Sequence, residues 1–254
     1  MKNPLIGIVI PIIQKKYILK LLLNIKNMIN NGNCIVCVVN DGNKKINDYL
    51  SQNLSKNIEL LNLEKNLGFS SANNNGWKYL INKYPSIIYL GSINDDTSPD
   101  KNWLNQMEMT LKQNPNVGAC SPGMITYTGF LKNKKKYYST CKLSNKNNPM
   151  IFDKSKILKD TYVSVFSGFC FLAKVEVLKK INFFDEEYKN SCEDIDLCLK
   201  IRKKNYDLMA TANTYVVHYG GKSRFKQKLN TNIKKSREIL LKKWGKDLEQ
   251  YNLS

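Results

Sequence analysis

Strand-like and helix-like segments alternate through the first ninety residues of the chain. Four apolar runs have the length of strands, and segments with helical spacing of apolar residues lie between them. The expected strands are Ile6–Ile10, Cys34–Val39, Ile58–Leu63 and Ile87–Leu90, and the expected helices are Ile18–Ile29 and Asn74–Lys83. Strands that alternate with helices pair in parallel, and the helices cover the sheet. The sequence therefore predicts an α/β fold built on a mostly parallel sheet.

The rest of the chain is less regular. Residues Leu131–Lys159 are rich in Lys and Asn and show little periodicity, which is typical of an irregular or inserted segment. A helix is expected over Glu193–Lys204 and a last strand over Ala210–Tyr219. The segment Lys222–Lys246 carries ten basic residues against Glu238 alone. We find neither an internal repeat nor a clear linker, so we expect one domain with a basic tail.

The chain is strongly basic. Its 40 Lys and Arg and 21 Asp and Glu give a formal net charge of +19, which favours nucleic acid, anionic lipid or a phosphorylated small molecule as partner. An AT-rich coding sequence would also produce this excess, because Lys, Asn and Ile are all abundant. With 42% hydrophobic and 24% charged residues, the composition excludes a disordered, collagen-like or coiled-coil protein.

The cysteines and the apolar segments of the chain indicate the cellular compartment in which it works. Seven cysteines, an odd number, lie mostly in apolar runs, which argues against a disulfide framework and fits a reducing compartment. Cys34 and Cys37 form a C-x-x-C pair inside an expected buried strand, without a second pair at zinc-site spacing. Nothing reaches the ~18 apolar residues of a membrane span, and Leu5–Ile13 is a poor signal peptide. The expected location is cytoplasmic.

Ligands of parallel sheets bind beyond the carboxyl ends of the strands. Here these exits are Pro11–Gln14, Asn40–Asn43 and Asn94–Asp96, and two of the three carry acids. Oxygen atoms of Asp and Asn suit Mg²⁺ or Mn²⁺, which usually bind one or two carboxylates together with substrate phosphates. A plain turn is the alternative for Asn94–Asp96, because turn-forming residues surround it.

An acidic segment, Ser191–Leu197, begins the helix expected in the second half. Ser191 and Asp194 have the spacing of a capping box, and acids at a helix start are favoured by its dipole. A carboxylate held at such a helix start could instead accept a proton from a substrate hydroxyl. The two interpretations are compatible.

Two further segments have both a structural and a functional interpretation. His218 is the only histidine and precedes two glycines and the basic Lys222 and Arg224, a setting that suits either a structural role or contact with metal or phosphate. The segment Asn66–Gly76 is dense in amides and small residues, so it is either a surface loop or a place where backbone approaches a ligand closely. It matches neither common glycine-rich phosphate motif.

Taken in order, these segments resemble the family-two glycosyltransferases, particularly the rhamnosyltransferase-like branch. The resemblance runs from about Leu5 to about Arg224. Each motif is weak by itself, but their order is specific. The motifs are the opening strand with Pro11, the turn Val38–Asn43, Asn66-x-Gly68-Phe69 through Asn74-x-Gly76, Leu90–Asp96 as a variant of D-x-D, Ser167-Gly168, Phe183–Glu186, Glu193–Leu197 and His218.

The resemblance implies a GT-A fold, in which a single Rossmann-like, mostly parallel sheet is flanked by helices. It also implies an inverting transferase that uses Mn²⁺ or Mg²⁺ and a nucleotide-sugar donor, with UDP- and dTDP-linked sugars the leading donors. The acceptor would be a hydroxyl of a saccharide or of a lipid-linked glycoconjugate. Residues 1–224 would form the glycosyltransferase domain, and residues 225–254 a basic helical extension packed on or flanking it.

The resemblance implies roles for residues near the leaving diphosphate and for residues near the attacking acceptor hydroxyl. Asp96 would ligate the metal that bridges the donor diphosphate, with Asn94 and Asp95 close to the metal and the ribose. His218 would contact the metal or the diphosphate. Asp194 would be the base that takes the proton of the acceptor hydroxyl, so base and metal site are separate in the sequence.

Further residues complete the expected site. Glu193 is the second candidate catalytic carboxylate, and Gly168 would leave room beside the two sugars. The expected donor-binding residues are Pro11, Asn40, Asp41, Asn66, Gly68, Asn74, Asn94, Asp95, Gly168, Lys222 and Arg224, with Pro11 and Asp41 lining the nucleoside pocket. Many relatives have Asp at the position of Asn40 and Thr-Tyr-Asn or similar at Ile12–Gln14. These departures fall on the nucleoside pocket, so the residues of the pocket do not support a base preference, and the leading donors follow from the resemblance alone.

A rival interpretation is a catalytically inactive GT-A-like module that binds polyanions, either nucleic acid or anionic lipid, through its basic surface. Nucleic-acid binders usually interleave basic residues with stacking aromatics. The tail offers mainly Phe225, Trp244 and Tyr251, which argues against nucleic acid. A basic helix also favours anionic lipid, so peripheral contact of the tail with a membrane stays open.

Overall fold

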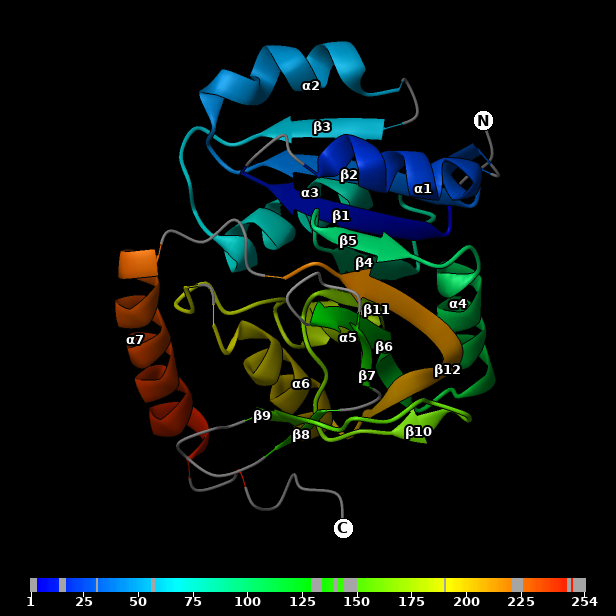
Figure 1. Cartoon of the computed structure of the whole chain (residues 1–254), viewed down its shortest axis with the longest axis vertical. Coiled ribbons are helices and arrows are strands. Elements are labelled where there is room, and N and C mark those ends of the chain that lie inside the picture. The colour runs from blue at the N-terminus through cyan, green and yellow to red at the C-terminus, as the bar shows by residue number, and fades with distance from the viewer. Residues whose placement is uncertain are drawn as a thin grey trace.

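The computed structural model describes residues 4–13, 17–30, 32–55, 58–128, 134–138, 141–143, 150–189, 191–220, 226–245 and 248. Ten strands of these residues form one curled sheet, in the order β10-β12-β6-β11-β4-β1-β2-β3, with β5 paired to β12 and β7 paired to β6 (Figure 1). The strands of this sheet are β1 (Ile6–Ile12), β2 (Cys34–Asn40), β3 (Ile58–Asn62), β4 (Tyr89–Ile93), β5 (Thr97–Pro99), β6 (Val117–Thr128), β7 (Lys134–Tyr138), β10 (Thr161–Tyr162), β11 (Cys170–Lys174) and β12 (Asp207–His218).

Six of the ten strands run in one direction, as the alternation of segments predicted: β1, β2, β3, β4, β6 and β12. β1 is parallel to both β2 and β4, β2 is parallel to β3, and β6 is parallel to β12. β11 is antiparallel to β4 on one side and to β6 on the other. A separate antiparallel pair consists of β8 (Cys141–Leu143) and β9 (Met150–Phe152). The curled α/β sheet is thus mixed but mainly parallel.

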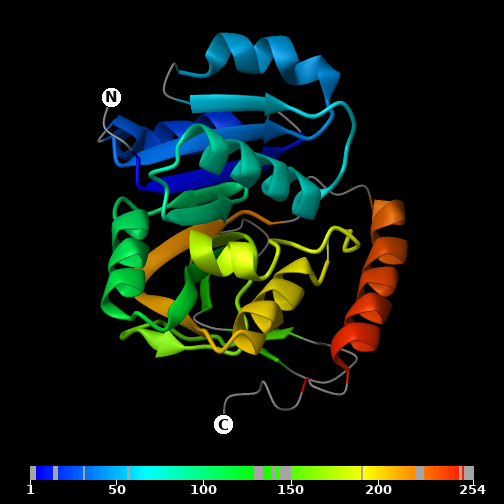
Figure 2. The same cartoon turned by 180° about the vertical axis from the view of Figure 1, so that it is seen from behind.

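Helices cover both faces of the sheet. They are α1 (Ile18–Asn30), α2 (Asn47–Asn53) after the short 3₁₀ helix η1 (Lys44–Ile46), α3 (Phe69–Lys83), α4 (Trp103–Gln113), α5 (Val175–Lys180), α6 (Glu193–Lys203) and α7 (Lys226–Trp244). Figure 2, seen from behind, shows α3, α5 and α6 on the near face, with α7 beside α6. Among the described residues, no helix combines the length and the apolar character that a membrane crossing requires.

The two faces of β1 explain this layering. Because successive side chains of a strand point to opposite faces, Ile8 and Ile10 pack in the same core as α1 and α4, whereas Val9 packs in the core that contains α3. A Cβ added at Gly76 of α3 would lie 2.7 Å from a methyl carbon of Val9 and 2.8 Å from one of Val39. The glycine therefore lets α3 lie close against the sheet.

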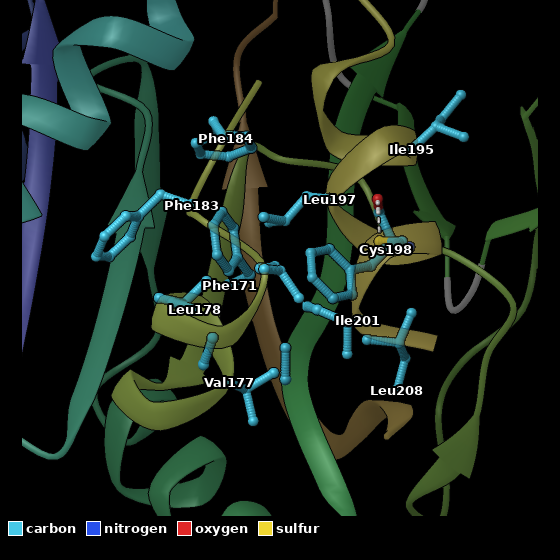
Figure 3. Packing of buried hydrophobic residues seen from close by; sticks show 14 of the residues in the cluster. Phe171, Val177, Leu178, Phe183, Phe184, Ile195, Leu197, Cys198, Ile201 and Leu208 are labelled. Carbon is cyan, nitrogen blue, oxygen red and sulfur yellow. Dashed lines mark hydrogen bonds between the residues drawn. The ribbon is translucent and has the colours of Figure 1, made fainter. Parts of the chain in front are cut away.

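A second part of the α3-side core surrounds α6. Figure 3 shows Leu197 of α6 pointing toward Phe171 of β11, where Phe183 and Phe184 of the turn before α6 also gather. Ile195, Cys198 and Ile201 of α6 belong to the same buried cluster. In that turn, Phe184 stacks on Trp77 of α3 with ring centroids 5.2 Å apart. Leu240 and Trp244 of α7 are buried in this same core. The helix that carries the acidic motif is thus packed from several sides.

Several sequence predictions of local structure were wrong in detail. The helix expected from Asn74 begins at Phe69, so most of the predicted glycine- and amide-rich loop is helical. Helix α4 and the long strand β6 were not predicted. The described part of Leu131–Lys159, expected to be irregular, contains the short strands β7, β8 and β9.

Candidate active site

Several strands bring functional side chains to one edge of the sheet. β1, β2, β4, β6 and β12 run in one direction, because β11 is antiparallel to both β4 and β6. The carboxyl ends of β4 and β12 therefore meet the amino end of β11. The backbone N–H of Asn94 donates to the carbonyl of Phe169 (2.9 Å), and that of Tyr219 donates to the carbonyl of Asp96 (3.0 Å). The strand-exit acids and the only histidine thus lie at one edge.

Asp96 and His218 form the centre of this edge. His218 Nε2 lies 3.2 Å from Asp96 Oδ1, and the Asp96 side chain is mostly buried. The His218 ring stacks on Phe169 with centroids 5.3 Å apart and planes 15° apart, which fixes its orientation. Burial, reinforced by the charge of Asp96, raises the pKa of the neighbouring Asp95 carboxyl to about 7. The edge therefore concentrates negative charge in a partly desolvated place.

This donor set fits a divalent cation that is shared with a substrate. A cation near Asp96 would relieve the mutual repulsion of Asp95 and Asp96, and carboxylate oxygen and imidazole nitrogen are both suitable ligands for Mn²⁺. Among the described residues, no three His, Cys, Asp or Glu side chains are grouped closely enough to hold an ion by themselves. The pair of Asp96 and His218 would need further ligands, such as phosphate oxygens and water.

Asp194 contacts Gly168, the residue before Phe169. Its Oδ2 accepts a hydrogen bond of 2.9 Å from the Gly168 N–H, and its Oδ1 accepts one of 2.9 Å from the Ile195 N–H. Gly168 is buried, and a Cβ added there would lie 3.1 Å from the Asp194 Cβ. Since Phe169 stacks on His218, the adjacent residues Gly168 and Phe169 contact the Asp194 carboxylate and the Asp96–His218 pair, respectively.

The start of α6 differs from the capping box expected at Ser191. The helix begins at Glu193, and its N-cap is Cys192, which has a left-handed backbone (φ 66°) and makes no side-chain capping bond. Ser191 lies one residue too early to cap the helix, because the left-handed turn at Cys192 intervenes. Glu193 and Asp194 both lie in the first turn, where the helix dipole favours acids. Glu193 is half-buried there.

Asp41, expected in the nucleoside pocket, binds the backbone at the start of α3. Its Oδ1 accepts from the Leu67 N–H (2.7 Å) and its Oδ2 from the Gly68 N–H (3.0 Å). Burial raises the pKa of this carboxyl, although the two backbone bonds and nearby Lys189 oppose the rise. The next residue, Gly42, has φ 77°, and a Cβ there would lie 2.2 Å from the backbone of Lys65 and Asn66. The β2 exit and the loop before α3 are therefore locked together.

Asn40 uses its side chain inside the protein. It is 1% exposed, its amide N–H groups donate to Asn43 O and Asn62 Oδ1 (each 3.0 Å) and to Asn47 Oδ1, and its oxygen accepts from the Asn43 N–H. The side chain thus shapes the turn that presents Asp41.

Asn74, another expected donor-binding residue, is also engaged with protein. Its Nδ2 donates to Phe184 O (3.0 Å) and to Glu186 Oε1 (2.8 Å), and its Oδ1 accepts from the Phe184 N–H. Ser71 Oγ donates to the other Glu186 oxygen at 2.6 Å. The motif residues of α3 and of the Phe183–Glu186 turn therefore bind each other. Only the co-occurrence of the two motifs could have indicated this pairing from the sequence.

The remaining expected donor-binding residues are more dispersed. Pro11 is half-buried in β1 and pairs with Val39, Asn66 is exposed, and Gly68 is the N-cap of α3 with φ 90°. Lys222 and Arg224 lie outside the described residues.

Comparisons with known proteins identify the family of this chain. A family model described as "Glycosyl transferase family 2" matches residues 7–182. Rhamnosyltransferase WbbL of Escherichia coli (strain K12) is 24% identical over 159 residues, which are 51% of this chain and 60% of that protein. This chain therefore spans less than two thirds of that relative.

Three solved structures share the fold of this chain. GalNAc-T7 with UDP, GalNAc and Mn²⁺ matches with a TM-score of 0.72 and 11% identity, over 97% of this chain and 49% of that one. Mannosyltransferase PcManGT from Pyrobaculum calidifontis, with GDP-Man and Mn²⁺, matches with a TM-score of 0.60 and 15% identity, over 87% and 58%. S. aureus TarS 1-349 in complex with UDP matches with a TM-score of 0.55 and 16% identity, over 85% and 60%. At these identities the likeness shows the fold.

Proposed function

Because the chain belongs to glycosyl transferase family 2, we propose that it is an inverting, metal-dependent glycosyltransferase. It moves a sugar from a nucleotide-sugar to a hydroxyl of a saccharide or glycoconjugate acceptor. The observation that carries this proposal is that the Asp194 carboxylate contacts Gly168 whereas His218 of the Asp96–His218 pair stacks on the next residue, Phe169, so the two groups are separate and border the same short segment. An inverting displacement needs this separation, since the acceptor attacks from the side opposite the leaving group.

The leaving-group side would be Asp96, His218 and Asn94. These residues would hold Mn²⁺ or Mg²⁺, which would stabilise the negative charge that builds on the departing nucleoside diphosphate. Neighbours of the same fold hold UDP or GDP-Man, two of them with Mn²⁺, which supports a nucleotide-sugar donor. The likeness to a rhamnosyltransferase favours a hexosyl or deoxyhexosyl group from a UDP- or dTDP-linked donor.

The acceptor side would be Asp194. The N–H groups of Gly168 and Ile195 each donate one hydrogen bond to its carboxylate, which orients the group. This carboxylate would accept the proton of the attacking hydroxyl. A carboxylate is a weak base, but it suffices when proton transfer accompanies the attack. Glu193, one residue earlier in the same turn, is the second carboxylate on this side.

The basic tail has two faces. Ser236, Leu240 and Trp244 of α7 are buried, whereas cationic residues of the opposite face are exposed, among them Lys234 and Lys235. We propose that residues 225–254 form an extension of the 1–224 transferase domain and that the exposed face contacts anionic lipid near a lipid-linked acceptor. Binding to vesicles that contain phosphatidylglycerol, abolished by high salt and by replacing both lysines with Glu, would support this. Equal binding to neutral vesicles would contradict it.

A thermal-shift panel tests the proposed donor site. UDP, dTDP, GDP and CDP are each added with and without Mn²⁺, and a nucleotide at 100 times its dissociation constant should stabilise the fold by about 2.7 kcal/mol. We expect one nucleotide to stabilise the chain only with metal. The matching nucleotide-sugars are then tested for transfer, and the anomeric configuration of the product is read by NMR. No shift with any nucleotide would contradict the proposal and favour an inactive module that binds polyanions.

A further inference from the structure

A second acid of α6, Asp196, is held by the C-terminal helix. Asp196 is fully buried, and its Oδ1 accepts a hydrogen bond of 2.8 Å from Trp244 Nε1. Lys243 Nζ lies 2.8 Å from the same oxygen, and the Tyr188 hydroxyl lies 3.4 Å from it. A buried carboxylate is stable only with such partners. On α6 itself, Lys200 Nζ lies 4.0 Å from the other oxygen, Oδ2. The last two residues of α7 therefore make the two shortest of these contacts.

Asp194 and Asp196 point to different sides of α6. Successive residues of a helix are about 100° apart, so two positions along the helix lead nearly to its other side. Asp194 meets Gly168 at the candidate active site, whereas Asp196 meets Lys243 and Trp244 of α7. Figures 1 and 2 both show α7 alongside α6. The C-terminal helix thus supports α6 from the side away from the site.

The same face of α7 also holds the segment that leads into α6. Lys243 Nζ lies 2.7 Å from Asp185 Oδ2, and the Lys189 N–H donates to Ser236 Oγ at 3.3 Å. Burial by itself would lower the pKa of Lys243, but its bonds to Asp185 and Asp196 raise it. Lys243 is therefore a firmly charged link between α7, the turn before α6, and α6 itself.

We infer that α7 positions the proposed catalytic carboxylate, with Lys243 and Trp244 as positioning residues that fix the rotation of α6 and so the place of Asp194. The inference rests on the proposed function of Asp194. Apolar packing of Leu240 would hold α7 near α6, but it would not set the rotation of the helix. Directional bonds to one buried oxygen do set it. A displacement of a reacting group by about 1 Å can cost a factor of about 100 in rate.

The test compares Lys243→Met and Trp244→Phe with Lys242→Met. The first change removes the cation, and the second keeps an aromatic ring but removes the Nε1–H donor. Lys242 is the exposed neighbour of Lys243 on α7 and serves as the matched control. Hydrogen exchange of the segment 186–200 is measured by mass spectrometry, and kcat and donor KM are measured with the nucleotide-sugar chosen by the thermal-shift panel.

We expect exchange in residues 186–200 to rise about tenfold in Lys243→Met and Trp244→Phe and to stay unchanged in Lys242→Met. We expect kcat to fall about tenfold or more, while donor KM stays within about twofold. Lys243→Arg keeps the charge and the donors and should restore most of kcat. Exchange and kcat at the level of the unchanged protein would overturn the inference.

Two controls keep the result interpretable. Urea unfolding shows whether each variant is folded under the assay conditions, and Asp196→Asn is a second, isosteric variant that weakens the same link if Trp244→Phe does not fold. If the unchanged protein transfers sugar from no donor, the proposed function fails. The exchange measurement still decides whether α7 holds α6, so the two failures are distinguishable.

Discussion

The backbone N–H of Gly168 donates a 2.9 Å hydrogen bond to Asp194 Oδ2, and a Cβ added at position 168 would lie 3.1 Å from the Asp194 Cβ. Gly168 therefore orients the proposed base and lets it pack closely against the backbone. Because Phe169 follows and stacks on His218, any shift of this segment is transmitted to both halves of the site.

Gly168→Ala should slow transfer about 10- to 100-fold. The added methyl would lie 3.1 Å from the Asp194 Cβ, so the carboxylate or the strand must move, at a cost in stability of about 1–3 kcal/mol. Steady-state kinetics and urea unfolding measure the two effects. Full activity in this variant would show that the contact does not position the base.

Asp194→Asn should reduce transfer about 100- to 10,000-fold while nucleotide binding stays intact. The amide oxygen can still accept the Gly168 N–H, although the Ile195 N–H loses its side-chain acceptor. The fold should therefore be kept, but the group no longer accepts a proton. Thermal shifts with the nucleotide and Mn²⁺ provide the control. Loss of nucleotide binding together with activity would argue that Asp194 is a structural residue of the helix start.

Removal of Asp96 or His218 should abolish the metal-dependent part of nucleotide binding. Asp96→Asn and His218→Ala each remove one member of the pair whose atoms lie 3.2 Å apart. Calorimetric titration of the nucleotide with Mn²⁺ and with EDTA separates the two parts. In the presence of Mn²⁺, we expect both variants to bind the nucleotide only as tightly as the unchanged protein binds it in EDTA. If Mn²⁺ still strengthens nucleotide binding in both variants, the metal lies elsewhere.

Asp41 variants separate a structural role from a nucleoside-binding role. Asp41→Ala leaves the Leu67 and Gly68 N–H groups without their acceptor, and we expect a loss of about 1–3 kcal/mol in the free energy of unfolding. Asp41→Asn keeps one acceptor oxygen and should recover part of that loss. If Asp41 also binds the nucleoside, Asp41→Asn still lowers nucleotide affinity in calorimetry. Unchanged affinity would restrict Asp41 to its structural role.

Acid should destabilise the protein through Glu59. Although burial opposes it, hydrogen bonds from Lys83, Tyr84 and Tyr79 lower the pKa of Glu59 below its ordinary value of 4.5. The folded state then binds fewer protons than the unfolded chain, so this contribution is present above pH 4.5 and is lost as pH falls through the lowered pKa. Urea unfolding at neutral pH should show Glu59→Gln about 1–2 kcal/mol less stable, with the gap closing in acid. A gap that persists in acid would contradict the prediction.

Strand-exit reasoning predicted which side chains share an edge of the sheet, because it depends on chain direction alone. Asp41 and Asp96 follow strands and His218 ends one, and the sheet brings those strand ends to one edge. The amides of Asn40 and Asn74 were instead predicted to bind donor. Their partners, Asn62 and Phe184, are distant in sequence, and local pattern carries no information on such contacts.

Contacts between residues distant in sequence also explain why α3 begins earlier than predicted. Ser71 and Asn74 are polar and were predicted to lie in or next to a loop, yet both are buried. They are accommodated because Glu186 and Phe184 provide their hydrogen-bond partners. Tertiary contacts thus override local preference here. From the sequence, Lys243 contributed only to the charge of the tail and Trp244 only to its aromatic content. Their common hydrogen-bonding partner, Asp196, is distant in sequence and is brought to them by the fold.

The link between Asp196 and α7 also bears on how the chain folds as it leaves the ribosome. Trp244 follows Asp196 by 48 residues, so α6 is synthesised well before its partners emerge. Until then Asp196 has to stay near water or be buried without its main partners, and an unpaired buried charge is strongly unfavourable. We therefore expect the parallel half of the sheet around β1 to form first during synthesis, and α6 to dock only when α7 closes over it.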